Sequence, residues 1–556
     1  MSNKKLPGGD SAHVDSFTRD NLPPPEQWAE MDYTVLPELA AYGDRMNAAV
    51  DLLDRHVAAG RGERTAILFG DLHWSYGELK DRADRVARVL VEDMGLVPGN
   101  RVLLRGPNNP MMAAAWLGIV KAGGVCVATM PLLRARELAF IIDKAEIRHA
   151  LCDSALTEEL DGAQAMSGRL DAVGSFTATG DGASDVDRLM ASKPAGFDNC
   201  DTAADDVALI AFTSGTTGQP KGTMHFHRDV LAMCDCFPRY VFGAEADDVY
   251  TGSPPLAFTF GLGANLCFPL RFGAAVALVD RPTPEALLTT IARHKCTALY
   301  TAPTMFRAML DRLGDYDLSS LVKCVSAGEH LPRPTFEAWR AATGIAIIDG
   351  LGSTEMIHIF VSAAGDDIRP GATGKAIPGY RACIMDDDGA ILAPGEIGNL
   401  AVRGPTGCRY LDDPERQRAY VKKGWNLPGD VYRMDEDGYF WYQARADDMI
   451  ISAGYNISGP EVESILLEHD AVADCAVVAA PDPQRGHIVK AFVVLRDPAQ
   501  AGPALVKTLQ DFVKAEIAPY KYPRAVAFVN ALPRTGTGKV QRFRLRQQEE
   551  EKASQS

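Results

Sequence analysis

The sequence predicts an α/β protein with a large multi-layer α/β N-terminal domain and a small α+β C-terminal domain. Short apolar runs alternate with segments whose apolar residues recur every three or four positions, the pattern of a sheet covered by helices. The 556 residues are too many for one hydrophobic core and suit two or more domains. A polar, charged stretch near residues 436–448 marks the expected border between them.

The larger part of the chain repeats this alternation in order. Residues 1–30 are polar and proline-rich, and we expect them to follow the surface without regular structure. The helices expected from apolar spacing are Met46–Ala59, Tyr76–Glu92, Pro110–Ala122, Glu137–Lys144, Glu285–His294 and Thr304–Leu313. The expected strands are Thr65–Phe69, Arg101–Arg105, Val125–Met130, Val207–Phe212, Val276–Val279 and Ala298–Thr301.

We place the domain border at Arg445, between a domain of residues 1–444 and a domain of residues 445–556. The second segment has the length of an ordinary small domain. Its expected helices are Glu461–Glu468 and Leu505–Glu516, and its expected strands are Ala473–Ala479 and Lys490–Leu495. After Gln547 we expect a solvated charged tail.

Composition narrows the class of partner. The formal net charge of −16 argues against nucleic acid and anionic membranes as partners and favours small molecules. The first residues have no apolar core of a secretory signal, and no apolar run is long enough to span a membrane. Eleven scattered cysteines indicate reduced thiols, and therefore a cytoplasmic protein. The oligomeric state is left open between monomer and homodimer.

The stretch TSGTTGQPKG, residues 213–222, has the chemistry of a phosphate-binding loop. It follows the predicted buried strand 207–212, and Gly215 and Gly218 let the backbone turn close to a ligand. Hydroxyls come from Thr213, Ser214, Thr216 and Thr217, and Lys221 adds a positive charge. The spacing of a Walker loop is absent, and an ordinary loop remains the alternative for a generic stretch of this composition.

This string resembles the nucleotide-binding signature of the adenylate-forming superfamily, which includes acyl- and aryl-CoA ligases. The resemblance implies ATP and CoA as co-substrates, Mg²⁺ as cofactor and a carboxylic acid as the third partner. A second stretch, IIDGLGSTE at residues 347–355, matches another superfamily segment. By resemblance Thr354 contacts phosphate and Glu355 is the Mg²⁺ ligand. Taken alone, the same stretch also reads as a helix cap.

Further superfamily motifs assign the rest of the nucleotide site. Relatives line the adenine pocket with segments that match Gly328, Glu329, Asp349 and Gly350. Leu351 stands where relatives often carry an adenine-stacking aromatic residue. The motifs PGD and RADD resemble those whose aspartate holds the ribose and whose arginine binds the nucleotide, here Asp430 and Arg445. In the family, Asp447 is the hinge at which the small domain turns between two catalytic poses.

The small domain matches the family in three places. Lys539, in LPRTGTGKVQR, would bridge the acid and the phosphate in the first step. Gly454 and Tyr455 lie in the segment that faces the active site in the second pose, where glycine lets the thin CoA arm pass. Lys521 is a candidate contact for a CoA phosphate. Lys221, Thr354, Glu355 and Lys539 are therefore the expected catalytic residues.

The acid pocket is expected at Phe258, Thr259, Phe260 and Gly261. His358, three residues after Glu355 in the sequence, is expected to line it too. The chain resembles benzoate- and 2-aminobenzoate-CoA ligases over nearly its whole length, so an aromatic acid is the first choice of substrate. A short or medium aliphatic acid is the alternative. A nucleotide-binding sensor without turnover is the alternative of another class. The pair His225 and His227 reads as a metal site only weakly.

Overall fold

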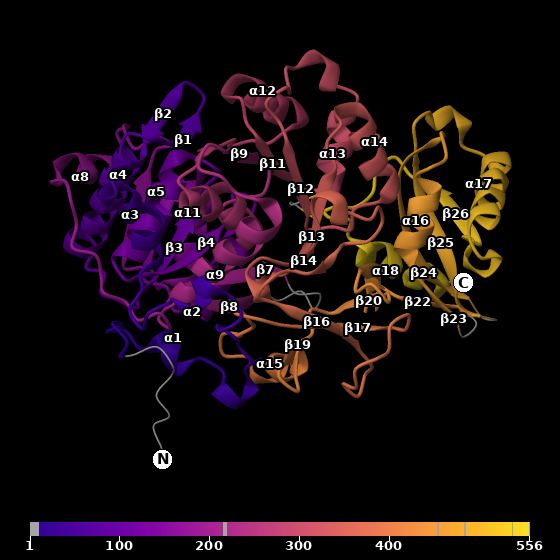
Figure 1. Cartoon of the computed structure of the whole chain (residues 1–556), viewed down its shortest axis with the longest axis horizontal. Coiled ribbons are helices and arrows are strands. Elements are labelled where there is room, and N and C mark those ends of the chain that lie inside the picture. Colours follow the sequence, from indigo (N-terminus) through magenta and orange to yellow (C-terminus); the bar gives the residue numbers. More distant parts are fainter. Residues whose placement is uncertain are drawn as a thin grey trace.

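The computed structural model of the chain describes residues 10–214, 220–446, 448–452, 455–482, 485–535 and 538–554. Within these ranges the strands form five sheets, which Figure 1 shows with their helices. Two large sheets make up the body of the molecule, a third sheet lies beside them, and two small sheets belong to the C-terminal part.

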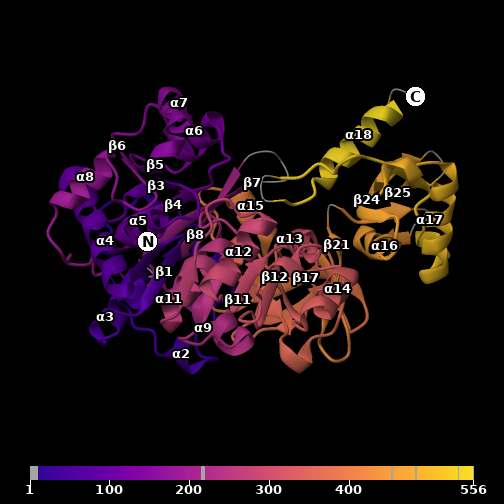
Figure 2. The same cartoon turned by 90° about the horizontal axis from the view of Figure 1, so that it is seen from above.

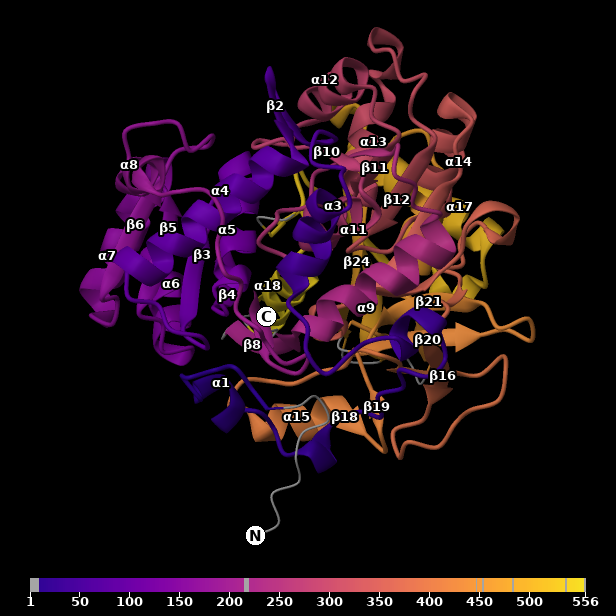
Figure 3. The ribbon, with the colours of Figure 1, turned by 60° about the vertical axis from the view of Figure 1, so that its left-hand side comes forward.

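The first large sheet has the strand order β6-β5-β3-β4-β7-β8, and Figure 3 shows β6, β5, β3 and β4 side by side. Its strands are β3 (Arg101–Arg105), β4 (Val125–Thr129), β5 (His149–Asp153), β6 (Ala172–Phe176), β7 (Val207–Ser214) and β8 (Pro220–Phe226). All neighbours are parallel except β7 and β8. Every residue of β3 and β5 is buried, as expected for parallel strands covered on both faces.

The second large sheet has the strand order β15-β14-β13-β12-β11-β9-β10-β1-β2. Its strands are β1 (Thr65–Phe69), β2 (Leu72–Ser75), β9 (Val249–Gly252), β10 (Ala275–Ala277), β11 (Ala298–Thr301), β12 (Lys323–Ala327), β13 (Ile347–Gly352), β14 (Ile359–Ser362) and β15 (Lys375–Ala376). The run from β1 to β13 is parallel, and β2, β14 and β15 pair antiparallel at its ends.

Helices cover both sheets. They are α1 (Phe17–Asp20), α2 (Pro37–Ala40), α3 (Arg55–Ala58), α4 (Tyr76–Arg88), α5 (Pro110–Lys121), α6 (Ala135–Lys144), α7 (Thr157–Ser167), α8 (Asp185–Ser192), α9 (His227–Phe237), α10 (Thr259–Leu262), α11 (Phe268–Phe272), α12 (Pro284–His294), α13 (Pro303–Leu310), α14 (Arg333–Thr343) and α15 (Pro414–Tyr420). A π-helical turn at Val50–Asp54 precedes α3, and another at Val89–Asp93 prolongs α4.

One hydrophobic core joins the two large sheets. It contains Val102 and Ala208 from the first sheet together with Ile67 and Tyr300 from the second. Parallel strands end at the same edge of a sheet, and ligands of such folds bind outside these carboxyl ends. β7 ends at such an edge, and the loops that follow β12 and β13 leave from the corresponding edge of the second sheet, so the packing of the two sheets positions the predicted motifs.

The third sheet is antiparallel and connects the body to the C-terminal part. Its strands are β16 (Arg381–Met385), β17 (Ile397–Arg403), β18 (Val421–Lys422), β19 (Trp425–Asn426), β20 (Asp430–Met434) and β21 (Phe440–Arg445). In the β20–β21 pair, Asp430 stands directly opposite Arg445. Two residues that lie fifteen positions apart in the sequence therefore become neighbours.

The C-terminal part forms a smaller unit at the side of the body (Figures 1 and 2). Its elements are β22 (Ile450–Ser452), β23 (Tyr455–Ile457), α16 (Gly459–Leu466), β24 (Val472–Asp482), β25 (Gly486–Leu495), α17 (Pro503–Glu516), β26 (Ala525–Phe528) and α18 (Arg542–Ser554). Two hydrophobic clusters consist only of residues from this part. Arg307 of α13 pairs with Asp474 of β24 at 3.3 Å and links the unit to the body.

Most elements predicted from the sequence are confirmed. The strands Thr65–Phe69, Arg101–Arg105 and Ala298–Thr301 have their predicted bounds, and the predicted helices agree within a few residues at their ends. The division into a larger and a smaller part also agrees with the sheets and clusters. The border at Arg445 itself, between residues 1–444 and 445–556, stays a prediction.

The chain ends differ from the expectations in two ways. Residues 542–554 form the helix α18, which was not predicted and which Leu545 anchors by packing against Phe492 and Leu532; after Gln547 its described residues are exposed, as expected, except Glu549. Glu549 is also buried, and it pairs with Lys490 of β25 at 2.5 Å. Near the N-terminus, short helices stand at Phe17–Asp20 and Pro25–Gln27, where we expected no regular structure.

We expect the Leu545→Ala variant to weaken the small unit. Leu545 is 3% exposed, and truncating a buried leucine costs about 2–5 kcal/mol. Phe543→Ala on the same helix is the control, because Phe543 is 50% exposed and surface changes cost about 0.5 kcal/mol or less. Hydrogen exchange of the β24 amides measures the effect. Equal protection in the two variants would contradict the packing described for α18.

Candidate active site

Lys221, Glu355 and Tyr410 form a closed triangle of polar contacts beside the ends of β7 and β13. The Lys221 ammonium lies 2.5 Å from Glu355 Oε1. The Tyr410 hydroxyl donates to the same Oε1 at 2.7 Å and accepts from Lys221 Nζ at 2.8 Å. The Glu355 side chain is only 8% exposed, so the ion pair is largely shielded from water.

Local structure explains why these side chains meet. Tyr410 stands opposite Thr223 in an antiparallel bridge, and Lys221 lies two residues before Thr223 on β8. Side chains two residues apart on a strand share a face, so Lys221 and Tyr410 point to the same side. Glu355 sits in the turn Thr354–Met356 directly after β13, where the Ser353 hydroxyl accepts from the Met356 amide at 3.3 Å.

The electrostatics fix the protonation states of the triangle. Burial opposes ionisation of Glu355, but the charge of Lys221 and hydrogen bonds from Lys221 and Tyr410 outweigh it and lower the pKa of the carboxyl group. Burial, followed by the charge of Glu355, raises the pKa of Tyr410. At neutral pH Glu355 is therefore a carboxylate and Tyr410 a protonated phenol.

Thr213, at the end of β7, faces the same region. It is the register partner of Lys221 across the β7–β8 pair. Its hydroxyl oxygen is buried, and none of the residues the structure describes hydrogen-bonds to it. A buried polar atom of this kind needs a partner, so this hydroxyl is suited to a ligand oxygen.

The loop that carries Lys539 reaches from the small unit back to the body (Figure 2). A Cβ built on Gly328 would lie 3.7 Å from Lys539 Cε. Lys539 keeps contact with solvent, but the protein atoms around it lower the pKa of its ammonium group. Glu329, Asp430 and Glu355 oppose this shift, whereas Arg445 adds to it. The neighbouring carboxylates thus favour the charged form of Lys539, whereas the surrounding protein atoms oppose it.

Asp430 and Arg445 form an ion pair next to this loop. Arg445 donates to Asp430 Oδ1 at 3.2 Å and to the Pro428 carbonyl at 3.0 Å. Burial raises the pKa of Asp430, although the charges of Arg445 and Lys539 oppose the shift. Glu329, on the other side of the loop, has a pKa raised by burial and lies 3.9 Å from Arg534.

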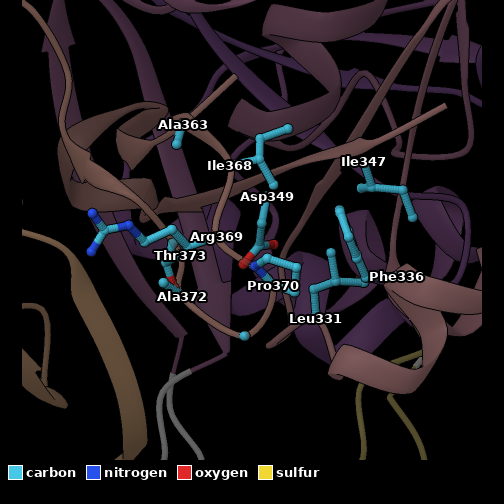
Figure 4. Close-up of a pocket in the computed structure, with 11 residues that line it drawn as sticks. Leu331, Phe336, Ile347, Asp349, Ala363, Ile368, Arg369, Pro370, Ala372 and Thr373 are labelled. Carbon is cyan, nitrogen blue, oxygen red and sulfur yellow. The ribbon is translucent and has the colours of Figure 1, made fainter. Parts of the chain in front are cut away.

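Asp349 lines a small cavity behind β13 (Figure 4). Its side chain lies among Leu331, Phe336 and Pro370. Burial raises the pKa of Asp349 to about 8, so the carboxyl group is protonated at neutral pH. Within the described ranges Asp349 Oδ1 has no hydrogen-bond partner. A neutral buried carboxyl can both accept and donate a hydrogen bond to a ligand.

The stretch predicted for the acid meets His358 in an aromatic cluster. The His358 ring lies 4.4 Å from the Phe268 ring and 5.6 Å from the Phe260 ring. Its Nε2 lies 3.3 Å from the Phe260 carbonyl, which requires the proton on that nitrogen. A Cβ at Gly263 would lie 2.5 Å from His358 Cδ2, so only glycine permits this packing.

Two other residues of the acid stretch lie on a cavity wall next to this cluster. Phe258 and Thr259 line a space beside β4 and β7, together with Trp116 and Leu262. Gly261 follows them at a very close backbone approach, because a Cβ there would lie 1.9 Å from the Pro255 carbonyl oxygen. The stretch predicted for the acid therefore lies between the aromatic cluster around His358 and the apolar wall that contains Trp116 and Leu262.

Several predicted site residues lie outside this cluster or outside the described residues. Gly350 is buried on β13, where the backbone pairs with Ala327 of β12. Lys521 pairs with Glu461 at 2.7 Å within the small unit. The residues outside the described ranges are Gly215, Thr216, Thr217, Gly218, Asp447 and Gly454, and the side chains of Ser214 and Tyr455 are likewise not described.

Tyr410 is a site residue that the sequence analysis missed. It belongs to no motif with an obvious chemical role and follows Arg409, whose buried ion pair with Asp229 is structural. The His225 and His227 pair serves the fold, because His225 Nε2 contacts the Thr354 carbonyl at 2.8 Å and His227 Nδ1 accepts from the Ala48 amide. The described part of the chain contains no cluster of histidine, cysteine or acidic residues able to hold a metal unaided.

The donor set nevertheless fits Mg²⁺ that arrives with a nucleotide. Such ions are bound by one or two carboxylates together with phosphate oxygens, and Glu355 offers one buried carboxylate. Thr354 stands beside it with a hydroxyl. Hard oxygen donors of this kind suit Mg²⁺ better than softer metals.

Comparison with protein families gives two matches. Residues 54–409 match the model of the AMP-binding enzyme family. Residues 461–539 match the model of the AMP-binding enzyme C-terminal domain. In addition, no helix among the described residues is long and apolar enough to cross a membrane.

Individual relatives are similar over almost their whole length. The chain is 36% identical to a benzoate–CoA ligase of Thauera aromatica over 526 residues, which covers 93% of this chain and 98% of that protein. The structure of the anthranilate CoA ligase AuaEII in complex with anthranoyl-AMP has a TM-score of 0.88 at 33% identity, covering 94% and 100% of the two chains. A benzoate CoA ligase from Burkholderia xenovorans LB400 has a TM-score of 0.82 at 33% identity, covering 90% and 99%.

We expect the His358 ring to stay neutral throughout the physiological pH range. Burial lowers the pKa of His358 to about 3, against about 6.5 for an exposed histidine. In histidine-labelled protein, the His358 ring resonance should show no titration between pH 5 and pH 8. The His358→Gln variant assigns the resonance. A midpoint near pH 6.5 would contradict the buried, neutral ring.

Proposed function

The chain belongs to the AMP-binding enzyme family, and from this we propose that it is an ATP-dependent, AMP-forming acid:CoA ligase for an aromatic carboxylic acid. The observation that carries the proposal is the shielded Lys221–Glu355 ion pair at the edge of the sheets, together with the approach of Lys539 to Gly328. Relatives named as benzoate– and 3-hydroxybenzoate–CoA ligases support the aromatic class.

In the proposed first step, a carboxylate oxygen of the acid bonds to the α-phosphorus of ATP. The bond from that phosphorus to the oxygen bridging the β-phosphate breaks, and pyrophosphate leaves. Negative charge builds up on the phosphate oxygens, so Lys221 and Lys539 stabilise it as fixed cations. Thr354 and Thr213 supply hydroxyls, and Glu355 would hold Mg²⁺, which screens the charge of the phosphates when it is bound.

In the proposed second step, the CoA sulfur bonds to the acyl carbon of the adenylate. The carbon–oxygen bond to AMP breaks, AMP leaves with the electron pair, and the thiol proton is released. The small domain would turn at Asp447 between the steps, so that Gly454 and Tyr455 replace Lys539 at the site. We assign Lys521 as a contact for CoA; its ion pair with Glu461 would have to open.

The other predicted nucleotide-site residues are assigned to the ribose, the adenine and the phosphates. Asp430 and Arg445 would bind the ribose and the nucleotide phosphate, and Gly328, Glu329 and Gly350 would line the adenine site. The Asp349 carboxyl would hydrogen-bond the adenine amino group, a role that suits a buried, unpaired polar atom. The loop residues Ser214, Gly215, Thr216, Thr217 and Gly218 would hold the phosphates.

An aromatic acid suits the lining of the proposed acid pocket. Phe258, Phe260 and a neutral His358 provide flat, weakly polar surfaces, and aromatic rings prefer such neighbours. Thr259 and Gly261 complete the wall. An aliphatic acid is the alternative substrate, and a sensor without turnover is the alternative of another class. We further propose a cytoplasmic enzyme, since all eleven cysteines are free thiols.

Acid-dependent exchange of pyrophosphate into ATP tests the proposed function. Benzoate, 2-aminobenzoate, hydroxybenzoates and short fatty acids are compared, and CoA consumption is scored in parallel. We expect exchange and thioester formation with at least one aromatic acid, at higher kcat/KM than with any fatty acid. Preference for a fatty acid would overturn the aromatic class. ATP binding without acid-dependent exchange would favour the sensor.

We expect Lys539→Ala to slow adenylate formation by about 10²–10³-fold, the loss expected for one preorganised charge partner. Thioester formation from preformed adenylate should change much less, because Lys539 leaves the site in the second pose. Single-turnover assays measure the two steps separately. Lys507→Ala is the control, since this lysine is 70% exposed on α17. Equal loss in both steps would contradict the assigned role.

A further inference from the structure

Tyr410 is held at the centre of the site by its backbone. The Met224 amide donates to the Arg409 carbonyl at 2.8 Å, and the Leu411 amide donates to the Gly222 carbonyl at 2.9 Å. These bonds attach the Tyr410 segment to β8 on both sides of the residue. The Tyr410 amide itself donates to Gln417 Oε1 at 2.9 Å. The tyrosine therefore has little freedom to leave its position.

The ring of Tyr410 is also fixed. It packs edge-on against Tyr420, with ring centroids 5.7 Å apart and planes at 83°. The Tyr420 hydroxyl lies 3.2 Å from the Ser353 hydroxyl, which caps the turn that carries Glu355. Lys221 Nζ lies 5.1 Å from the centre of the Tyr410 ring. The Tyr410–Tyr420 pair thus connects Lys221 to the turn that carries Glu355.

The direct ion pair between Lys221 and Glu355 creates a physical problem for substrate binding. If Lys221 binds phosphate and Glu355 binds a cation, the 2.5 Å contact between them must open. A buried carboxylate that loses a donor pays a desolvation penalty, which is smaller when another donor remains. The Tyr410 hydroxyl can keep donating to Glu355 Oε1 while Lys221 moves away, so the carboxylate retains a protein partner.

On this geometry, and resting on the function proposed above, we propose that Tyr410 is a positioning residue for MgATP. Its hydroxyl holds the Glu355 carboxylate in place when the ion pair with Lys221 opens, and it remains an acceptor for Lys221 as the ammonium turns to the phosphates. The other explanation is that the hydroxyl only satisfies buried polar groups and contributes to stability alone.

The Tyr410→Phe variant separates the two explanations, because it keeps the ring and removes only the hydroxyl. Calorimetry should show about tenfold weaker binding of MgATP. This is the low end for a hydrogen bond to a charged group, because the variant also loses the weaker hydrogen bond that Tyr410 makes in the free protein, where Lys221 shares the same Glu355 oxygen. In turnover, KM for ATP should rise while KM for the acid stays unchanged.

Tyr380→Phe is the matched control. Tyr380 is also buried, and its hydroxyl bonds at 2.8 Å to Thr406, whose own hydroxyl donates to the Met356 carbonyl and not to the Glu355 carboxylate. Its loss should lower the melting temperature without changing the Kd for MgATP. A wild-type Kd in Tyr410→Phe, or equal shifts in the two variants, would overturn the proposal.

A double-mutant cycle with Glu355→Gln tests whether Tyr410 acts through the carboxylate. We expect non-additive losses of MgATP affinity, because each change removes the same charged hydrogen bond. Additive losses would overturn the proposal, even if Tyr410→Phe is less stable. Calorimetry needs neither acid nor CoA, so an incorrect acid assignment leaves this test intact. A wild-type chain that binds no MgATP would overturn both the function and this inference.

Discussion

The site depends on an ion pair, shielded from water, between residues that two different sheets position. Lys221 comes from the first large sheet and Glu355 from the second, and their contact at 2.5 Å requires the two sheets to pack in one relative position. The common hydrophobic core provides that position. Packing of apolar residues far from the site thus fixes the distance between opposite charges, whose interaction is strong because little water reaches them.

The same pair connects the fold to the chemistry of a nucleotide. An ammonium and a carboxylate that neutralise each other in the free protein provide, when separated, one group for phosphate and one for a cation. Lys539 approaches this region from the smaller unit, and its Cε lies 3.7 Å from the position of a Cβ built on Gly328. The body contributes the fixed groups Lys221 and Glu355, and the smaller unit contributes the further cation Lys539. This arrangement suits a reaction that carries out two steps at one site.

Elements such as the strands Thr65–Phe69 and Arg101–Arg105, and the motifs, could be predicted from the sequence because hydrophobic periodicity and glycine-rich strings are local signals. That Lys221 and Glu355 belong to one site could be anticipated only through resemblance to a family. Tyr410 could not be predicted, since its role arises from a bridge to Thr223, a contact between distant segments. The helix α18 was missed because its charged residues obscure the buried Leu545 and Glu549.

The account depends on the opening of the Lys221–Glu355 pair around a nucleotide, and a crystal structure of the wild-type protein with ATP and Mg²⁺ tests this most directly. We expect the Lys221 ammonium on phosphate oxygens, the Glu355 carboxylate turned to the cation, and the Tyr410 hydroxyl still bonded to that carboxylate. A bound nucleotide beside an intact Lys221–Glu355 ion pair would contradict the account.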